Sequence, residues 1–164
     1  MTSIIIKKVN KKYADDYAIS KLLDYIYRYN TNYHLPIHTY GIVSNDINYI
    51  KDAFYEHPEY GYNSDLSPNV IHLIVSFPRK KLITRDRYLV DTIARVFTPY
   101  YYTCYSFHND SKYAHAHIVV STRNKDFPLT QRMYNVLRGR ISQILQSPYY
   151  NKYYNIMQKE DYYV

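Results

Sequence analysis

The stretch YYYTCYSFHNDSKYAHAHIVVST, residues 100–122, decides how this chain folds. β-Branched and aromatic residues are concentrated in residues 100–108 and 114–122, which favours a strand in each segment. Residues 109–113 between them have the composition of a polar turn. Two strands joined by so short a turn pair as a hairpin, so this stretch predicts part of an antiparallel β-sheet.

Strand and helix signals alternate outside this hairpin. Further strands are predicted at residues 2–9 and 70–77, with a short extended piece at 38–43 and a surface loop at 57–68. Helices are predicted at residues 15–29, 46–56, 84–96 and 129–146, while residues 148–164 carry no assignable pattern. Asp15 or Asp16 can cap the first helix, and Thr84 or Asp86 the third. This order predicts an α+β fold in a single domain, 1–164, with a central antiparallel β-sheet and flanking helices on one side.

The length, the cysteine content and the apolar runs of the chain indicate its size class and its cellular compartment. Its 164 residues are enough for one domain with a buried core. Cys104 is the only cysteine, so no intramolecular disulfide can form, which favours a reducing compartment. The longest apolar runs have the length of strands and cannot cross a bilayer. We therefore expect a cytoplasmic monomer without membrane insertion.

The charge of the chain is basic, with 21 Lys and Arg against 14 Asp and Glu. This balance favours a nucleic-acid partner, although only weakly by itself. Arg123 and Lys125 are the first candidates for phosphate contacts because they follow the His-rich strand directly; Arg79, Lys80 and Lys81 come next. A solvated surface is an equal alternative for each cluster. The 24 tyrosines can stack on unpaired bases, but their abundance beside Lys, Asn and Ile also fits a codon bias.

Three histidines of the hairpin form the strongest chemical signal. His115 and His117 are two residues apart on a strand, so their side chains point to the same face, about 7 Å apart. Folding the hairpin places His108 roughly opposite His115, where Cβ atoms of paired residues lie about 5 Å apart. Three imidazoles then converge at one strand end. This arrangement predicts a metal centre with open coordination positions, suited to polarising a phosphate oxygen.

Structural explanations compete with this interpretation. A His-x-His pair on a strand is often a pair of buried side chains bonded to the backbone, and only the third histidine favours a metal. Asp110 either orients a histidine from behind or simply ends the strand as a turn residue. His72 shares a strand face with Ile74 and Ser76, so it is a candidate to approach the site, with a satisfied core histidine as the default.

Three segments together resemble a known family. His108-x-Asp110 followed by His115-x-His117-Ile-Val-Val resembles the third motif of conjugative relaxases, the HUH endonucleases that start plasmid transfer. The strand over residues 70–78 resembles the preceding strand of that family, and Lys21-Leu-Leu-Asp-Tyr25-Ile resembles its first motif. The segments occur in family order over most of residues 3–122, and the P-type mobilisation group fits best.

The resemblance implies an HUH fold and a specific reaction. Tyr25 would be the nucleophile, the three histidines would hold Mn²⁺ or Mg²⁺, and Asp110 would orient the site. Attack on single-stranded DNA at a transfer origin would leave a 5′-phosphotyrosyl bond, and reversal would reseal the strand. Accessory DNA-binding and coupling proteins are the implied partners. The helical pattern of residues 16–29 puts Tyr25 at the rim of the apolar stripe, with Tyr29 as a reserve candidate.

Two other interpretations stay open. Rolling-circle replication initiators and single-tyrosine transposases use similar chemistry but place the tyrosine on a late helix, where Tyr134 would be the candidate. A protein of a different class, a non-catalytic module that binds single-stranded DNA, would have structural histidines. The chain also departs from the family at Ser121, where many relaxases have asparagine.

Overall fold

The computed structural model describes residues 2–9, 11, 13, 15–32, 37–55, 69–109, 112–124 and 126–157, without the side chains of residues 28–32 and 157. The predicted loop at residues 57–68 lies outside this part of the chain. Among the helices that the structure does describe, none combines the length and the apolar character needed to cross a membrane.

A six-stranded sheet runs through the molecule in the order β2-β4-β5-β3-β1-β6. The strands are β1 Thr2–Lys8, β2 His38–Tyr40, β3 Val70–Ser76, β4 Thr103–His108, β5 His115–Ser121 and β6 Tyr154–Met157. All neighbours pair antiparallel except β1 and β6, which are parallel. The predicted α+β class, a central sheet with flanking helices, is confirmed. The sheet is mixed rather than purely antiparallel because β6 pairs in parallel with β1. Strand β6 belongs to residues 148–164, to which the sequence pattern assigns no structure, so the prediction did not include it.

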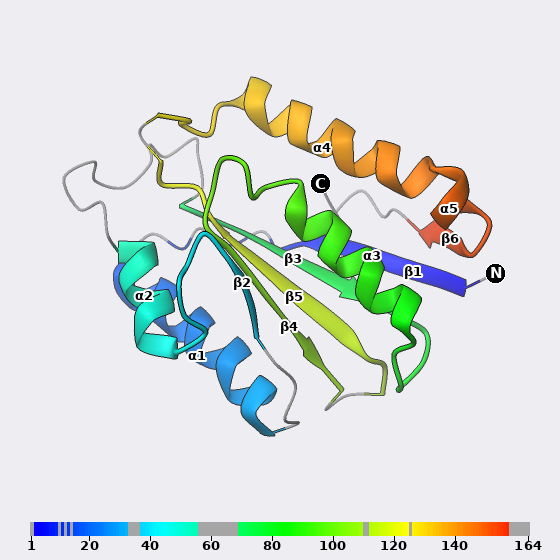
Figure 1. Ribbon diagram of the computed structural model, residues 1–164, viewed down its shortest axis with the longest axis horizontal. Helices are drawn as coiled ribbons and strands as arrows, with labels where there is room; N and C mark the ends of the chain where they lie inside the picture. Colours follow the sequence, from blue (N-terminus) through cyan, green and yellow to red (C-terminus); the bar gives the residue numbers. More distant parts are fainter. Residues whose placement is uncertain are drawn as a thin grey trace.

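Helices cover both faces of this sheet, so the prediction of helices on one side is wrong (Figure 1). The helices α1 (Asp16–Asn32) and α2 (Ile47–Tyr55) lie on one face. The opposite face is covered by α3 (Thr84–Arg95) and α4 (Gln131–Gln146), and the short α5 (Pro148–Asn151) follows α4. Each face therefore has its own apolar core.

Strand β4 shows why two cores form. Tyr105 and Phe107 pack in the core under α3 and α4, whereas Cys104 packs in the core under α1 and α2. All six residues of β4 are buried, including Ser106. Small side chains alternate with aromatic ones along β4, a pattern typical of a strand with one face in water. In the structure α1 covers the face with the small side chains.

The helix starts follow local hydrogen bonds. Asp15 caps α1, since its Oδ1 accepts the backbone N–H of Ala18 at 2.8 Å. At α3 neither predicted residue is the cap: Ile83 holds that position, and Asp86 accepts the Ile83 backbone N–H at 3.0 Å from within the first turn. Both arrangements satisfy backbone donors that have no partner inside the helix.

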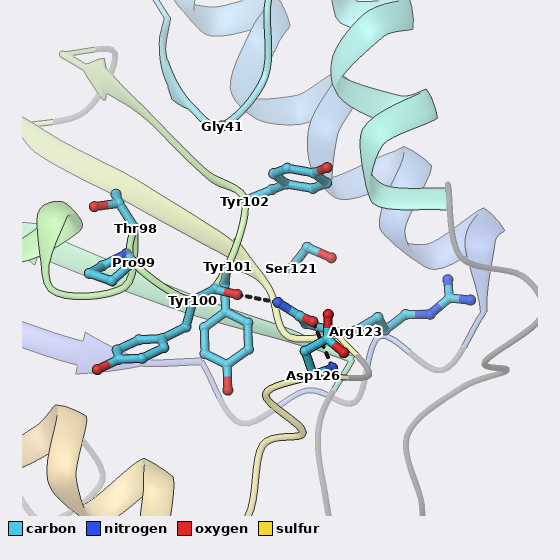
Figure 2. A pocket seen from close by; sticks show the side chains of 10 residues that line it. Gly41, Thr98, Pro99, Tyr100, Tyr101, Tyr102, Ser121, Arg123 and Asp126 are labelled. Carbon is cyan, nitrogen blue, oxygen red and sulfur yellow. Dashed lines mark hydrogen bonds between the residues drawn. The ribbon is translucent and has the colours of Figure 1, made fainter.

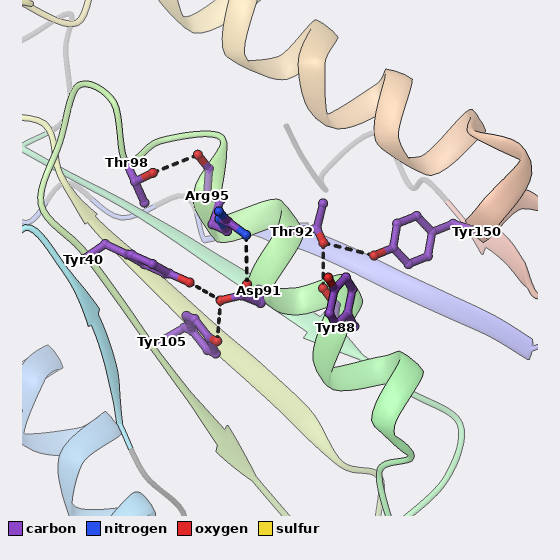
Figure 3. Close-up of polar contacts among 8 residues, drawn as sticks. All are labelled: Tyr40, Tyr88, Asp91, Thr92, Arg95, Thr98, Tyr105 and Tyr150. Atoms are coloured by element: carbon purple, nitrogen blue, oxygen red, sulfur yellow. Dashed lines mark hydrogen bonds and ion pairs between the residues drawn. The ribbon is translucent and has the colours of Figure 1, made fainter.

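A polar cluster fastens α3 to the strands beside it (Figure 3). Asp91 of α3 accepts hydrogen bonds from the Tyr105 hydroxyl of β4, at 2.7 Å, and from the Tyr40 hydroxyl of β2. Arg95 lies 4.0 Å from the same carboxylate. The short edge strand β2 is thereby tied to the helix across β4, which helps to keep the centre of the sheet in place.

Candidate metal centre and nucleophile

His108, His115 and His117 come together at one end of the β4–β5 hairpin. His108 is the last residue of β4 and pairs directly with His115, the first residue of β5. The ring centroids are 5.4 Å apart for His108 and His115, 4.5 Å for His108 and His117, and 5.0 Å for His115 and His117. One ligand nitrogen from each ring lies within 4.8 Å of the others. Small side-chain rotations would bring all three to about 2.1 Å from a shared ion.

The burial of the three rings suits a metal centre. His108 and His117 are almost fully buried, while His115 is partly open to solvent. The buried Nε2 atom of His117 makes no hydrogen bond within the described part of the chain. Such an orphaned nitrogen costs on the order of 1–3 kcal/mol, which a bound ion would relieve. The donor set and its one open side therefore fit a divalent cation.

His117 is the first member of a chain of hydrogen-bonded side chains that continues through His72 to Tyr13. Its Nδ1 atom is 2.8 Å from Nε2 of His72 on β3, and the Nδ1 atom of His72 is 2.9 Å from the Tyr13 hydroxyl. His72 therefore contacts a candidate ligand from the neighbouring strand instead of joining the ligand set. Tyr13, which sequence reasoning missed, precedes α1 and is held by Asn69, whose side-chain amide donates to the Tyr13 carbonyl oxygen at 3.1 Å.

Burial keeps these two histidines neutral. It lowers the pKa of His72 from 6.5 to about 4, with a smaller contribution from His108. It also lowers the pKa of His117 well below its ordinary value, and the neighbouring imidazoles act in the same direction. A neutral imidazole has a lone pair for a metal on one nitrogen and a proton to donate from the other. Donation from His117 Nδ1 to His72 would leave Nε2 as the ligand atom.

Helix α1 brings Tyr25 to the same place. The Tyr25 ring centroid is 5.5 Å from that of His108 and 5.4 Å from that of His117, both in edge-to-face geometry. Tyr25 is 40% exposed at the rim of α1, so its ring is open to solvent as well as to the histidines. Two residues on, Tyr27 packs against the core under α1.

The backbone of α1 also orients His108. Its Nε2 atom lies 3.3 Å from the Ile26 carbonyl oxygen. The Ser106 hydroxyl is also 3.3 Å from this nitrogen. A proton on Nε2 would satisfy the Ile26 carbonyl and leave Nδ1 as the ligand atom of His108. The Tyr29 side chain lies outside the described part of the chain, so the reserve candidate is not placed.

The predicted cationic contacts divide into two groups. Lys80 and Lys81 are exposed and line a cavity together with His108. Arg79 instead has partners within the protein. Its guanidinium group is 3.2 Å from the fully buried Asp86 carboxylate and donates a hydrogen bond to Thr2 Oγ1 at 2.7 Å. Asp110 and Lys125 lie outside the described residues.

Arg123 follows the end of β5 that is opposite the histidines, so it does not lie beside the candidate metal centre. The six steps from His115 to Ser121 separate the two ends by about 20 Å. Arg123 is 7% exposed and lies 3.4 Å from the Asp16 carboxylate at the start of α1. It lines a cavity of about 340 Å³ with Tyr100 and Tyr102, shown in Figure 2. Its ion pair joins α1 to the sheet.

Tyr134, the candidate of the alternative families, belongs to the other side of the sheet. It packs against the core under α3 and α4, below the ammonium group of Lys8. The histidines lie on the α1 face, beside Tyr25.

The arrangement combines a candidate metal centre, a phenol beside it and an open side toward solvent. Such a set can polarise a phosphate ester and attack it with an oxygen nucleophile. Comparisons of this chain with models of protein families, with curated proteins and with solved structures give no match.

Proposed function

We propose that this protein is a metal-dependent relaxase that nicks and rejoins one strand of DNA through Tyr25. The observation that carries the proposal is the position of the Tyr25 ring, edge-on to two of three converging histidines and open to solvent. The residues come from α1 and from the β4–β5 hairpin, which are far apart in the sequence. A phenol beside a candidate metal centre is a pairing that can support phosphotyrosyl chemistry.

In the proposed reaction Tyr25 attacks the phosphorus of a phosphodiester. A bond forms between the Tyr25 oxygen and phosphorus, and the bond from phosphorus to the 3′ oxygen breaks. The phenol loses its proton, and the departing 3′ oxygen takes one up. A divalent ion held by His108, His115 and His117 would supply positive charge to the phosphate. The number of phosphodiester bonds is conserved, so the reverse attack by the 3′-hydroxyl reseals the strand.

The location of the nucleophile favours a relaxase among the enzymes with this chemistry. Tyr25 belongs to the first helix, whereas Tyr134 on α4 packs on the opposite side of the sheet. The proposed role is the mobilisation of a plasmid or conjugative element. Its substrate would be single-stranded DNA at a transfer origin, with accessory DNA-binding and coupling proteins as partners.

The test is formation of a covalent protein–DNA adduct. Oligonucleotides from the transfer origin of the element that carries the gene are labelled at either end and incubated with Mn²⁺ or Mg²⁺. The product migrates as an adduct on a denaturing gel. Because the 5′-phosphate joins the tyrosine, the adduct must retain a 3′ label and lose a 5′ label. We expect Tyr25→Phe to abolish it and the matched variant Tyr27→Phe to retain it.

Two results would contradict the proposal. An adduct that survives Tyr25→Phe would assign the nucleophile to another residue. Metal-independent DNA binding by the parent protein, with no adduct on any origin sequence, would indicate a non-catalytic binding module instead.

A further inference from the structure

A second cavity lies at the same end of the sheet as the histidines. It has a volume of about 390 Å³ and is lined by residues of the β3–α3 loop, of α3 and of the end of β4, among them Lys80, Lys81, Arg87, Phe107 and His108. Such a volume lies within the usual range of small-ligand sites and is large enough for a nucleotide. His108 borders both this cavity and the candidate metal centre.

The loop that carries two of these cations is fixed to the hairpin. The backbone N–H of Ala114 donates to the Arg79 carbonyl oxygen at 2.8 Å, and the N–H of Phe77 donates to the Ala114 carbonyl oxygen at 3.0 Å. Arg79 itself is held by the buried Asp86. Lys80 and Lys81 therefore follow a residue whose backbone and side chain are both hydrogen-bonded to the rest of the fold. These bonds keep the two lysines near His108.

The charge of this cavity is not balanced by the described residues. No described carboxylate lines it, and neither Lys80, Lys81 nor Arg87 forms an ion pair with a described residue. Arg87 instead lies 5.7 Å from the centre of the Phe107 ring. By contrast, Arg79 and Arg123 have carboxylate partners. Three cations that share a cavity and have no carboxylate partner among the described residues are suited to a ligand that brings negative charge.

We propose that this cavity holds the nucleotide next to the one that is cut, with its phosphate bound by Lys80, Lys81 and Arg87. The DNA strand would pass from the histidines over the end of β4 into the cavity, since His108 is shared by both. This inference rests on the proposed function for the identity of the strand. Side-chain cations on a phosphate contribute affinity and position without reading sequence.

The experiment measures binding separately from cleavage. A fluorescent oligothymidylate of about 12 nucleotides, within the site sizes of single-strand binders, is titrated with the Tyr25→Phe protein in the presence of a chelator. The triple variant Lys80→Gln, Lys81→Gln, Arg87→Gln is compared with a matched triple variant on α4. That control, which removes the same charge from another exposed surface, carries Arg132→Gln, Arg138→Gln and Arg140→Gln.

We expect the cavity variant to bind on the order of tenfold to a hundredfold more weakly at low salt. The slope of log K against log salt should become shallower by about 0.7, because the three cations bind one phosphate and each neutralised phosphate on a single strand contributes about 0.7. The α4 control should retain most of the slope. Equal binding by the cavity variant and the α4 control would overturn the proposal.

The outcomes also separate this proposal from the proposed function. Cleavage by the parent protein together with unchanged binding by the cavity variant would refute the cavity and leave the nuclease standing. Weakened binding by the cavity variant, with no adduct from the parent protein, would support the cavity and refute the nuclease.

Discussion

Replacing His72 by leucine tests how the candidate metal centre is held together. Leucine removes the acceptor at 2.8 Å from His117 Nδ1 and the partner of the Tyr13 hydroxyl. When an ion occupies Nε2 of His117, the proton must sit on Nδ1 and needs an acceptor. In the variant that N–H is buried without one.

The expected magnitude follows from this lost acceptor. Leaving a buried donor without a partner costs roughly 1–3 kcal/mol, and loss of an outer hydrogen bond to a ligating histidine weakens metal binding by about 10–100-fold. The two ranges agree, because about 1.4 kcal/mol corresponds to a factor of ten in affinity. In the metal-free protein His117 can take the other tautomer, so most of this cost appears only when the ion binds.

Titration calorimetry with Mn²⁺ measures the effect. His72→Gln is the matched control, because its side-chain oxygen can accept the His117 proton, and it should recover most of the lost affinity. Thermal unfolding of the metal-free variants checks that both are folded. A folded His72→Leu protein that binds Mn²⁺ as tightly as the parent would refute the reasoning, since His117 would then not depend on His72.

Three further predictions concern stability. Burial lowers the pKa of His72 from 6.5 to about 4, so as pH falls the unfolded metal-free chain takes up a proton at this residue before the folded chain does. Up to about 3 kcal/mol of stability should therefore be lost between pH 6.5 and pH 4. The free energy of unfolding of His72→Gln in urea should depend less steeply on pH, and an equally steep dependence would show that His72 is not the group responsible. Asp91→Ala leaves the buried Tyr105 hydroxyl without its acceptor and should cost about 2 kcal/mol in urea unfolding, with Asp91→Asn costing less. Gly41 has a φ of +81°, and an added Cβ would lie 2.7 Å from the Tyr102 ring, so Gly41→Ala should lower the free energy of unfolding by about 1–2 kcal/mol; an unchanged urea midpoint would show that the loop relaxes.

The sequence determined the features that depend on short stretches of chain. Alternation of side chains along a strand puts His115 and His117 on one face, and a short connection between the strands makes His108 their neighbour. The spacing of apolar residues in α1 likewise places Ile26 under the helix and Tyr25 at its rim. These relations follow from local backbone geometry, so no distant contact was needed to predict them.

Only the tertiary structure decided which surfaces meet. The alternation in β4 could not reveal that α1 covers Cys104 and Ser106, because small polar residues are equally compatible with water. The contact of Tyr13 with His72 spans 59 positions and that of Arg123 with Asp16 spans 107. Local periodicity gives each element its apolar face, but many pairings of such faces are compatible with one pattern. The partner of each buried polar group is set when the whole chain packs, because only then is the cost of leaving it unpaired incurred.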